Sequence, residues 1–144
     1  MKAVHGTCVA IGEGALLLRG PPGSGESDLA LRLIEQGARL VTDDRVLLRG
    51  DRGKLHAFAP AALTGKVEAR GIGVLTVPFV RTARLIMVVG LVAGTAVPRL
   101  PEPATCTYEG GVLGVLALAP FEASTPAKLR LALARAPAPI PASA

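Results

Sequence analysis

The segment of this sequence best suited to chemistry is glycine-rich, GPPGSGES at positions 20–27. It matches the pattern G-x-x-x-x-G-K-[ST] everywhere except at Glu26, which stands where the pattern has lysine. In such loops backbone N–H groups turn towards a phosphate chain, the following helix adds its positive N-terminal end, and the serine or threonine holds Mg²⁺. The segment therefore predicts a phosphate-binding loop made of Gly20, Pro21, Pro22, Gly23, Ser24, Gly25, Glu26 and Ser27.

Glu26 reverses the charge that such a loop normally presents. The lysine of the pattern places a positive charge against the β- and γ-phosphates, so glutamate exchanges an attraction for a repulsion. The glycines that let the backbone hold phosphate are kept, but the positively charged side chain of the pattern is lost. The alternative interpretation is a plain Gly/Pro turn, because an acidic residue is favourable in the first turn of any helix.

The elements around the loop agree with a phosphate-binding role. Alternation and turn residues predict strands over 7–11 and 15–19, joined as a hairpin at 12–14. Apolar residues recur with helical spacing over 27–36, and Gly37 follows as a C-terminal cap. The loop would thus connect a strand to a helix, which is the context that the motif requires.

The rest of the chain predicts a mixed α/β fold. We expect a polar, glycine-punctuated segment over 66–73 and a helix with Ser124 or Thr125 as its N-cap and Pro126 just inside its start. The strand over 85–92 is apolar enough to be central and buried. The other predicted strands cover 39–42, 46–48, 55–58, 74–77 and 112–118. We predict one domain over 1–136 and a disordered Pro/Ala-rich tail over 137–144.

Asp43 and Asp44 form the second candidate for chemistry. They directly follow the predicted strand 39–42, which we expect beside the strand that leads into the loop. Open α/β sheets place ligand chemistry at the carboxyl ends of their strands. Taken in isolation, the same pair also suits a solvated turn.

Composition excludes several classes of protein. The net charge of +5 arises from scattered basic residues, and with no Trp and 3% aromatic residues the chain lacks a stacking platform for nucleic acid. Cys8 and Cys106 lie far apart without a metal-binding spacing, so neither zinc nor a disulfide is predicted. The apolar stretches are too short to span a bilayer, and we expect a cytoplasmic protein.

Four segments, in order along the chain, resemble the C-terminal catalytic domain of HPr kinase/phosphorylase, which acts on a serine of the phosphocarrier HPr. Besides GPPGSGES they are HGT at 5–7, LALRLIEQGARLVTDD at 29–44 and KVEARGIGVLTV at 66–77. The last contains the E-x-R-G-[ILV]-G core typical of that family. The short chain is similar to the alphaproteobacterial form without an N-terminal domain.

The resemblance implies a P-loop kinase-like mixed sheet flanked by helices, usually assembled as a hexamer, that phosphorylates HPr with ATP and removes the phosphate by phosphorolysis. Ser27 and Glu68 would hold Mg²⁺. Asp44 would be the general base towards the substrate serine, Asp43 would support the site, and His5 would lie close to the transferred phosphoryl group. Together with Glu26, these roles predict an impaired kinase.

Arg70 and Lys128 complete the residues that the resemblance implies. Arg70 belongs to the E-x-R-G signature and could face the negative charge that develops during transfer. Lys128 lies in PAKL at 126–129, where the family has a P-G-R-N-like loop that reaches a neighbouring active site. Lysine replaces the arginine and the following asparagine is absent, which weakens bidentate recognition of phosphate.

Simpler interpretations of these residues remain open at this stage. Glu68 and Arg70 also suit an exposed loop, and Lys128 also suits the solvent side of the last helix. Two rival functions differ in class from an active HPr kinase. One is a pseudokinase that binds nucleotide or HPr as a regulatory module, and the other is a P-loop kinase of a small molecule.

Overall fold

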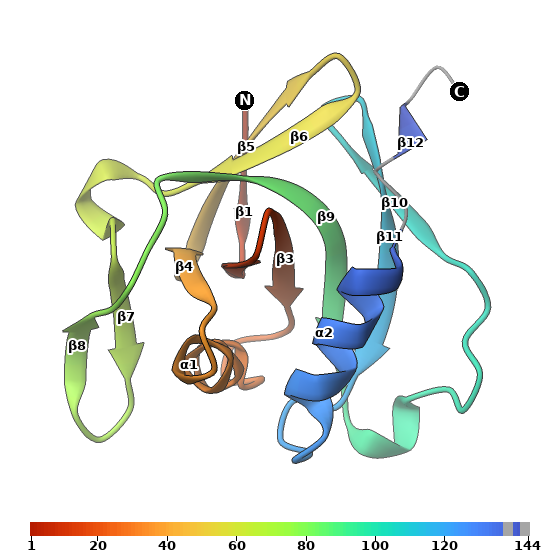
Figure 1. Cartoon of the computed structure of the whole chain (residues 1–144). Helices are drawn as coiled ribbons and strands as arrows, with labels where there is room; N and C mark the ends of the chain where they lie inside the picture. The colour runs from red at the N-terminus through yellow and green to blue at the C-terminus, as the bar shows by residue number, and fades with distance from the viewer. Residues whose placement is uncertain (137–139, 142–144) are drawn as a thin grey trace.

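The computed structural model describes residues 1–136 and 140–141 and shows a curled mixed sheet with two helices (Figure 1). The helices are α1 (Glu26–Glu35) and α2 (Thr125–Arg135), with short 3₁₀ turns η1 (Ala61–Leu63) and η2 (Gly94–Ala96). The strands are β1 (Lys2–His5), β2 (Thr7–Ile11), β3 (Gly14–Arg19), β4 (Arg39–Thr42), β5 (Arg45–Asp51), β6 (Lys54–Phe58), β7 (Lys66–Ala69), β8 (Gly73–Thr76), β9 (Thr82–Leu91), β10 (Thr105–Tyr108), β11 (Gly111–Leu118) and β12 (Ile140–Pro141). The predicted α/β class with a mixed sheet is confirmed.

Strand β9 is the centre of the sheet. It pairs in parallel with β3 on one edge, and on its other edge with β6 (antiparallel) and then β11 (parallel). Leu85 and Val89 of β9 are fully buried. A strand that is covered on both faces carries apolar side chains on both of them, and the sequence of β9 has this character. The prediction of a central, buried strand here is confirmed.

Strand β2 separates the strand before the glycine-rich loop from the strand before the paired aspartates. It runs antiparallel to both β3 and β4, so these two strands run in the same direction. Their carboxyl ends therefore meet at one edge of the sheet. The expectation that β4 lies directly beside β3 is wrong, because the first strand of the hairpin occupies that position.

The two faces of the sheet bury different sets of side chains. Leu16 and Leu18 of β3 pack with Leu29 and Leu33 of α1 and Leu129 of α2, so both helices cover this face. On the opposite face, Ala15 and Leu17 pack against Val46, Leu48, Leu55 and Leu85 as the sheet curls over itself. The alternation along β3 thus fixes which of its residues meet the helices.

Helix α1 ends where sequence reasoning placed its end, and α2 helps to hold that end. Gly37 adopts φ 106°, a conformation that glycine accepts without steric cost. The Arg130 guanidinium donates to the carbonyl oxygen of Gln36 (3.2 Å), which follows the last residue of the helix. It also donates to the carbonyl oxygen of Leu33 (3.3 Å), which already accepts from the amides of Gln36 and Ala38. Pro126 lies in the first turn of α2 as predicted, and Ser124 is its N-cap without a side-chain hydrogen bond.

Several elements differ from the sequence predictions. The polar segment 66–73 holds a strand that was not predicted, β7, which pairs with β8 in a separate two-stranded sheet whose turn lies between Ala69 and Gly73. Strands β1 and β10 were not predicted. Of the tail over 137–144, the pair Ile140–Pro141 lies beside Gly111–Val112 of β11, and residues 137–139 and 142–144 lie outside the described residues. No described helix has the length and apolar character needed to cross a membrane.

Candidate active site

The glycine-rich loop connects β3 to α1 and depends on its glycines. Gly23 (φ 79°) and Gly25 (φ 99°) adopt left-handed conformations that residues with a Cβ rarely take. A Cβ on Gly25 would also lie 2.7 Å from the ring of Phe121. The amide of Ser24 donates to the carbonyl of Pro21 (3.0 Å), which closes the turn before the helix.

Glu26 is the first residue of α1, and its carboxylate is buried at the positive end of the helix. Its exposed fraction is 8%. Oε1 accepts a hydrogen bond from the Ser24 hydroxyl (3.0 Å), and Oε2 lies 3.4 Å from Nε2 of His5 without a hydrogen-bond partner among the described residues. A negative charge is favoured here by the helix dipole. The side chain thus places a carboxylate at the start of the helix, at the position where the motif has a lysine.

Asp43 joins three separate segments of the chain. It is buried, and Oδ1 accepts hydrogen bonds from the hydroxyls of Thr7 (2.7 Å) and Ser27 (3.0 Å). The Glu68 amide donates to Oδ2 (3.3 Å), which brings β7 to the same carboxylate. Asp43 therefore holds β2, the start of α1 and the β7–β8 hairpin together.

Asp44 faces solvent and approaches His5. Its backbone is left-handed (φ 73°), which is uncommon for a residue with a side chain and is tolerated best by Asp and Asn. Its Oδ1 lies 3.2 Å from Nδ1 of His5, and its side chain is 77% exposed. The His5 imidazole therefore lies between two carboxylates, those of Asp44 and Glu26.

These side chains surround a cavity of about 280 Å³. It is lined by His5, Thr7, Glu26, Ser27, Asp43, Asp44, Leu63, Lys66, Val67, Glu68 and Val74. A larger, mostly apolar hollow of about 740 Å³ lies against the other part of the loop, with Pro21, Gly23, Ser24, residues 91–94 and residues 119–122 in its wall. The loop is thus flanked by a polar, acidic cavity and by an apolar one.

The structure brings most of the predicted residues together, but two of them lie elsewhere. Arg70 is exposed and makes no hydrogen bond or ion pair with a described residue. Lys128 lies on α2 with its Nζ 3.7 Å from Glu122, and neither basic residue lines the polar cavity. Sequence reasoning missed Thr7, although it is the last residue of the HGT segment, and Lys66, which begins the KVEARG segment.

The oxygen atoms of this cavity suit a hard cation such as Mg²⁺ better than a soft metal. The Ser27 hydroxyl and the carboxylates of Asp43, Asp44 and Glu68 are ligands that Mg²⁺ accepts, and the buried Oε2 of Glu26 adds an unpaired oxygen. Among the described residues, no group of three or more His, Cys, Asp or Glu side chains is arranged to hold a metal by itself. Mg²⁺ usually keeps several waters and shares phosphate oxygens, so a fully formed protein cage is not required.

Fold and site together define a mixed α/β protein in which a glycine-rich loop opens a helix beside paired aspartates. Comparison with known proteins gives the family. The sequence-family model of the HPr Serine kinase C-terminal domain matches residues 1–87, and the chain belongs to this family.

Curated relatives and a solved structure agree with this assignment. The HPr kinase/phosphorylase of Clostridium tetani is 40% identical over 75 residues, which is 52% of this chain and 25% of that protein. The HPr kinase/phosphorylase of Lactiplantibacillus plantarum is 42% identical over 77 residues, covering 53% and 24%. The chain thus matches about a quarter of the length of these relatives. The Hpr(Ser) kinase/phosphatase from Coxiella burnetii has the same fold, with a TM-score of 0.83 at 22% identity over 93% of this chain and 95% of that one.

Proposed function

We propose that this chain transfers the γ-phosphoryl group of ATP to a serine of HPr and removes it again by phosphorolysis, with activity reduced by Glu26. The observation that carries the proposal is the convergence of His5, Ser27, Asp43 and Asp44 on one cavity beside the glycine-rich loop. Phosphoryl transfer needs positioning, a divalent cation and a group that accepts the hydroxyl proton. This cavity offers residues for each requirement.

In the forward reaction the serine oxygen of HPr would form a bond to the γ-phosphorus while the bond to the oxygen of ADP breaks. Asp44 is the general base in this proposal, because its exposed carboxylate is accessible to a protein substrate. Its Oδ1 also lies 3.2 Å from Nδ1 of His5, which can orient the carboxylate. Buried Asp43 positions the Ser27 hydroxyl instead of reacting. In the reverse reaction inorganic phosphate attacks phosphoserine, releasing serine and pyrophosphate.

Nucleotide would lie along the loop. Phosphates would meet the amides of 23–27 and the start of α1, where Ser27 and Glu68 would share Mg²⁺, the ion that neutralises charge on the phosphates when bound. The apolar hollow beside Pro21 and Phe121 is large enough for a nucleoside, since small-molecule sites occupy about 300 to 1,000 Å³. ATP, Mg²⁺ and a cytoplasmic location are parts of this proposal.

Arg70 and Lys128 have no role within the polar cavity of a single chain. We place Arg70 at the rim, where its exposed guanidinium can reach a bound phosphoryl group or protein. Lys128 pairs with Glu122 away from the cavity, so its proposed role is at the site of a neighbouring copy in a homo-oligomer, a hexamer by analogy.

The second candidate function is a pseudokinase that binds HPr or nucleotide without efficient transfer. The buried Glu26 carboxylate favours it, because this group lies at the start of the helix in place of the lysine of the motif and would repel a polyphosphate. In this candidate the remaining site residues serve recognition and stability. Glu26 is therefore the residue on which the two functions differ.

Transfer of radiolabelled phosphate from ATP to HPr tests the proposal, using the unmodified chain, Glu26→Lys and Glu26→Lys with Asp44→Asn. We expect weak transfer by the unmodified chain, strong transfer by Glu26→Lys and loss of transfer in the double variant. A folded and assembled Glu26→Lys protein that transfers nothing to HPr would show the kinase proposal to be wrong. Transfer to a metabolite in place of HPr would assign the third function, a small-molecule kinase.

A further inference from the structure

A row of three basic side chains crosses one face of the sheet at a distance from the candidate active site. The register places Arg49 of β5 directly opposite His56 of β6, and His56 directly opposite Arg84 of β9. We call these three residues the basic row. Strand neighbours lie about 4.8 Å apart, so the two arginine backbones are separated by about 10 Å.

The three side chains point to the outer side of the sheet. Their chain neighbours Leu48, Leu55, Ala57 and Leu85 belong to the buried core on the inner side, and side chains alternate along a strand. Arg49 is exposed, and His56 and Arg84 are half-buried. Both helices lie over the other end of the sheet, away from the β5–β6 hairpin (Figure 1).

The basic row lacks acidic partners among the described residues. None of its members forms an ion pair or side-chain hydrogen bond there, and the buried Nε atom of Arg84 has no hydrogen-bond partner. The nearest acid on this face of β5, Asp51, lies in register with Lys54. Arg49 and Arg84 therefore present positive charge on this face that no described carboxylate neutralises.

The row continues towards the candidate active site. On β5, Arg45 lies on the same outer side, four residues or about 13 Å from Arg49, and directly opposite His5 of β1. His5 lines the polar cavity. A protein whose serine entered this cavity could therefore also cover the basic row.

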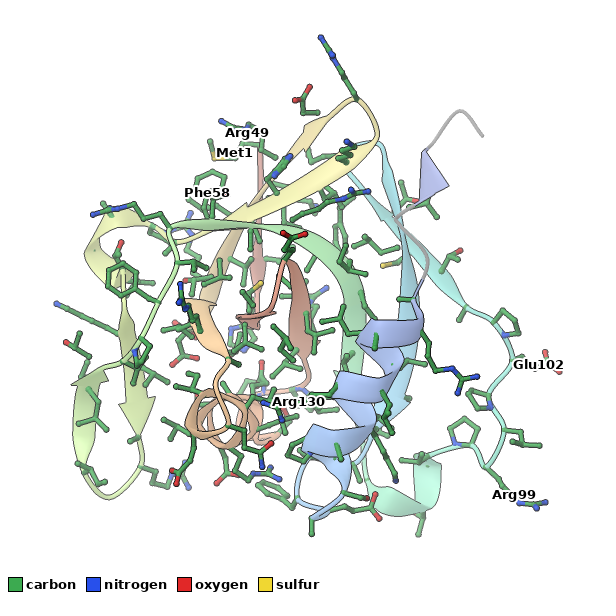
Figure 2. All side chains as sticks on the ribbon, in the orientation of Figure 1. Met1, Arg49, Phe58, Arg99, Glu102 and Arg130 are labelled. Carbon is green, nitrogen blue, oxygen red and sulfur yellow. The ribbon has the colours of Figure 1, made fainter. Side chains whose placement is uncertain are left out.

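An apolar strip lies beside the row on the same face. Leu47 and Phe58 are direct cross-strand neighbours and are half-buried, and the Arg49 guanidinium lies 5.9 Å from the centre of the Phe58 ring (Figure 2). Aromatic and arginine side chains together are typical of protein contacts. The row lines neither of the two cavities described above, so it lacks the enclosure that a small anion requires.

We propose that the basic row, with Leu47 and Phe58, is the docking surface for an acidic patch of the protein substrate. This inference rests on the proposed function for the identity of that substrate, HPr. Carboxylates of the bound protein would pair with Arg49 and Arg84 and satisfy the Nε of Arg84. The contact would contribute affinity and orientation, and no bond changes there.

Binding of fluorescently labelled HPr by anisotropy tests this surface directly, without requiring transfer. The variants are Arg49→Gln with Arg84→Gln, Arg49→Gln alone, and Arg99→Gln as the control. Arg99 is an exposed arginine in the irregular segment before β10 and lies far from Arg49 in Figure 2. Arg49→Gln keeps an exposed position and tests the row even if replacing half-buried Arg84 harms folding.

We expect the double variant to weaken HPr binding about tenfold and Arg49→Gln about threefold, with the control unchanged. The salt dependence of the dissociation constant should also become shallower in the double variant, because fewer charges contribute. The KM for ATP should not change. Arg49→Lys should keep most of the affinity if charge dominates.

Two outcomes would overturn the docking proposal: HPr that does not bind, or binding that the row variants leave unchanged. A single-stranded oligonucleotide that binds more tightly than HPr and depends on the row would instead assign this face to nucleic acid. Failure of the proposed function looks different. Glu26→Lys would then transfer nothing to HPr, while HPr still bound through the basic row.

Discussion

Replacement of Glu26 by lysine is the perturbation that most directly tests the charge argument. The Glu26 carboxylate is buried at the first turn of α1, 3.4 Å from His5 and within the wall of the polar cavity. A phosphate held by the loop would lie close to this carboxylate. Two unit charges about 4 Å apart interact by about 4 kcal/mol at an effective dielectric constant of 20.

The change removes a repulsion of this order and adds an attraction. Mg²⁺ and solvent neutralise much of the phosphate charge, so we discount the combined effect to about 2 to 3 kcal/mol. That corresponds to roughly hundredfold tighter binding of MgATP. Glu26→Gln removes only the negative charge. We expect the logarithm of its MgATP dissociation constant to lie about halfway between the values for the unmodified chain and Glu26→Lys.

Calorimetric titration of MgATP into the three proteins is the appropriate assay. Chemical denaturation without nucleotide provides the control, because lysine cannot accept the hydrogen bond from Ser24 and loses the favourable helix-dipole term. We expect Glu26→Lys to be less stable by about 1 to 2 kcal/mol. The reasoning is refuted if a folded Glu26→Lys protein binds MgATP no more tightly than the unmodified chain.

Three further predictions concern the fold. Leu129→Ala should lower the free energy of unfolding by about 2 to 5 kcal/mol in urea titrations, because Leu129 is fully buried between α2 and the sheet; a loss below 1 kcal/mol would contradict this packing. Arg130→Met should cost about 1 kcal/mol in the same measurement, since it removes the hydrogen bonds of the guanidinium to the carbonyl oxygens of Leu33 and Gln36 at the end of α1, and an unchanged midpoint would argue against this contact. Burial raises the pKa of the Cys8 thiol, so native Cys8 should resist thiol reagents, while half-buried Cys106 reacts first. Above the ordinary thiol pKa, the unfolded chain loses the Cys8 proton while the folded state retains it. The free energy of unfolding should therefore decline as the pH rises through this range, and Cys8→Ala should remove the part of the decline that Cys8 causes.

Sequence patterns predicted those elements whose signals are local. The hairpin of β2 and β3, helix α1 with Gly37 after it, and the start of α2 just before Pro126 follow from turn residues, helical periodicity and capping. Strands β1 and β10 were missed because each is four residues long and depends on a distant partner, β5 or β11, for its hydrogen bonds. Strand β8 overlaps the predicted strand 74–77, but β7 and its pairing with β8 were missed because the polar and glycine residues of 66–73 resemble a loop.

The candidate site divides in the same way. Residue types and spacing alone identified the glycine-rich loop, the substituted Glu26 and the paired aspartates as the groups able to do chemistry. Their different environments were not visible in the sequence: adjacent Asp43 and Asp44 differ completely, since one is buried among the donors of Thr7, Ser27 and Glu68 and the other is exposed beside His5.

The sequence by itself determined the local chemistry of this protein, because glycine conformations, helix ends and the charge at position 26 are properties of a few adjacent residues. Only the tertiary structure decided which distant groups meet. Strand β2 sets β3 and β4 parallel, and the curl of the sheet brings β1 to β5, so His5, Glu26 and Asp44 converge and Arg49, His56 and Arg84 align. These pairings arise from long-range hydrogen bonding and burial, which no short segment encodes alone.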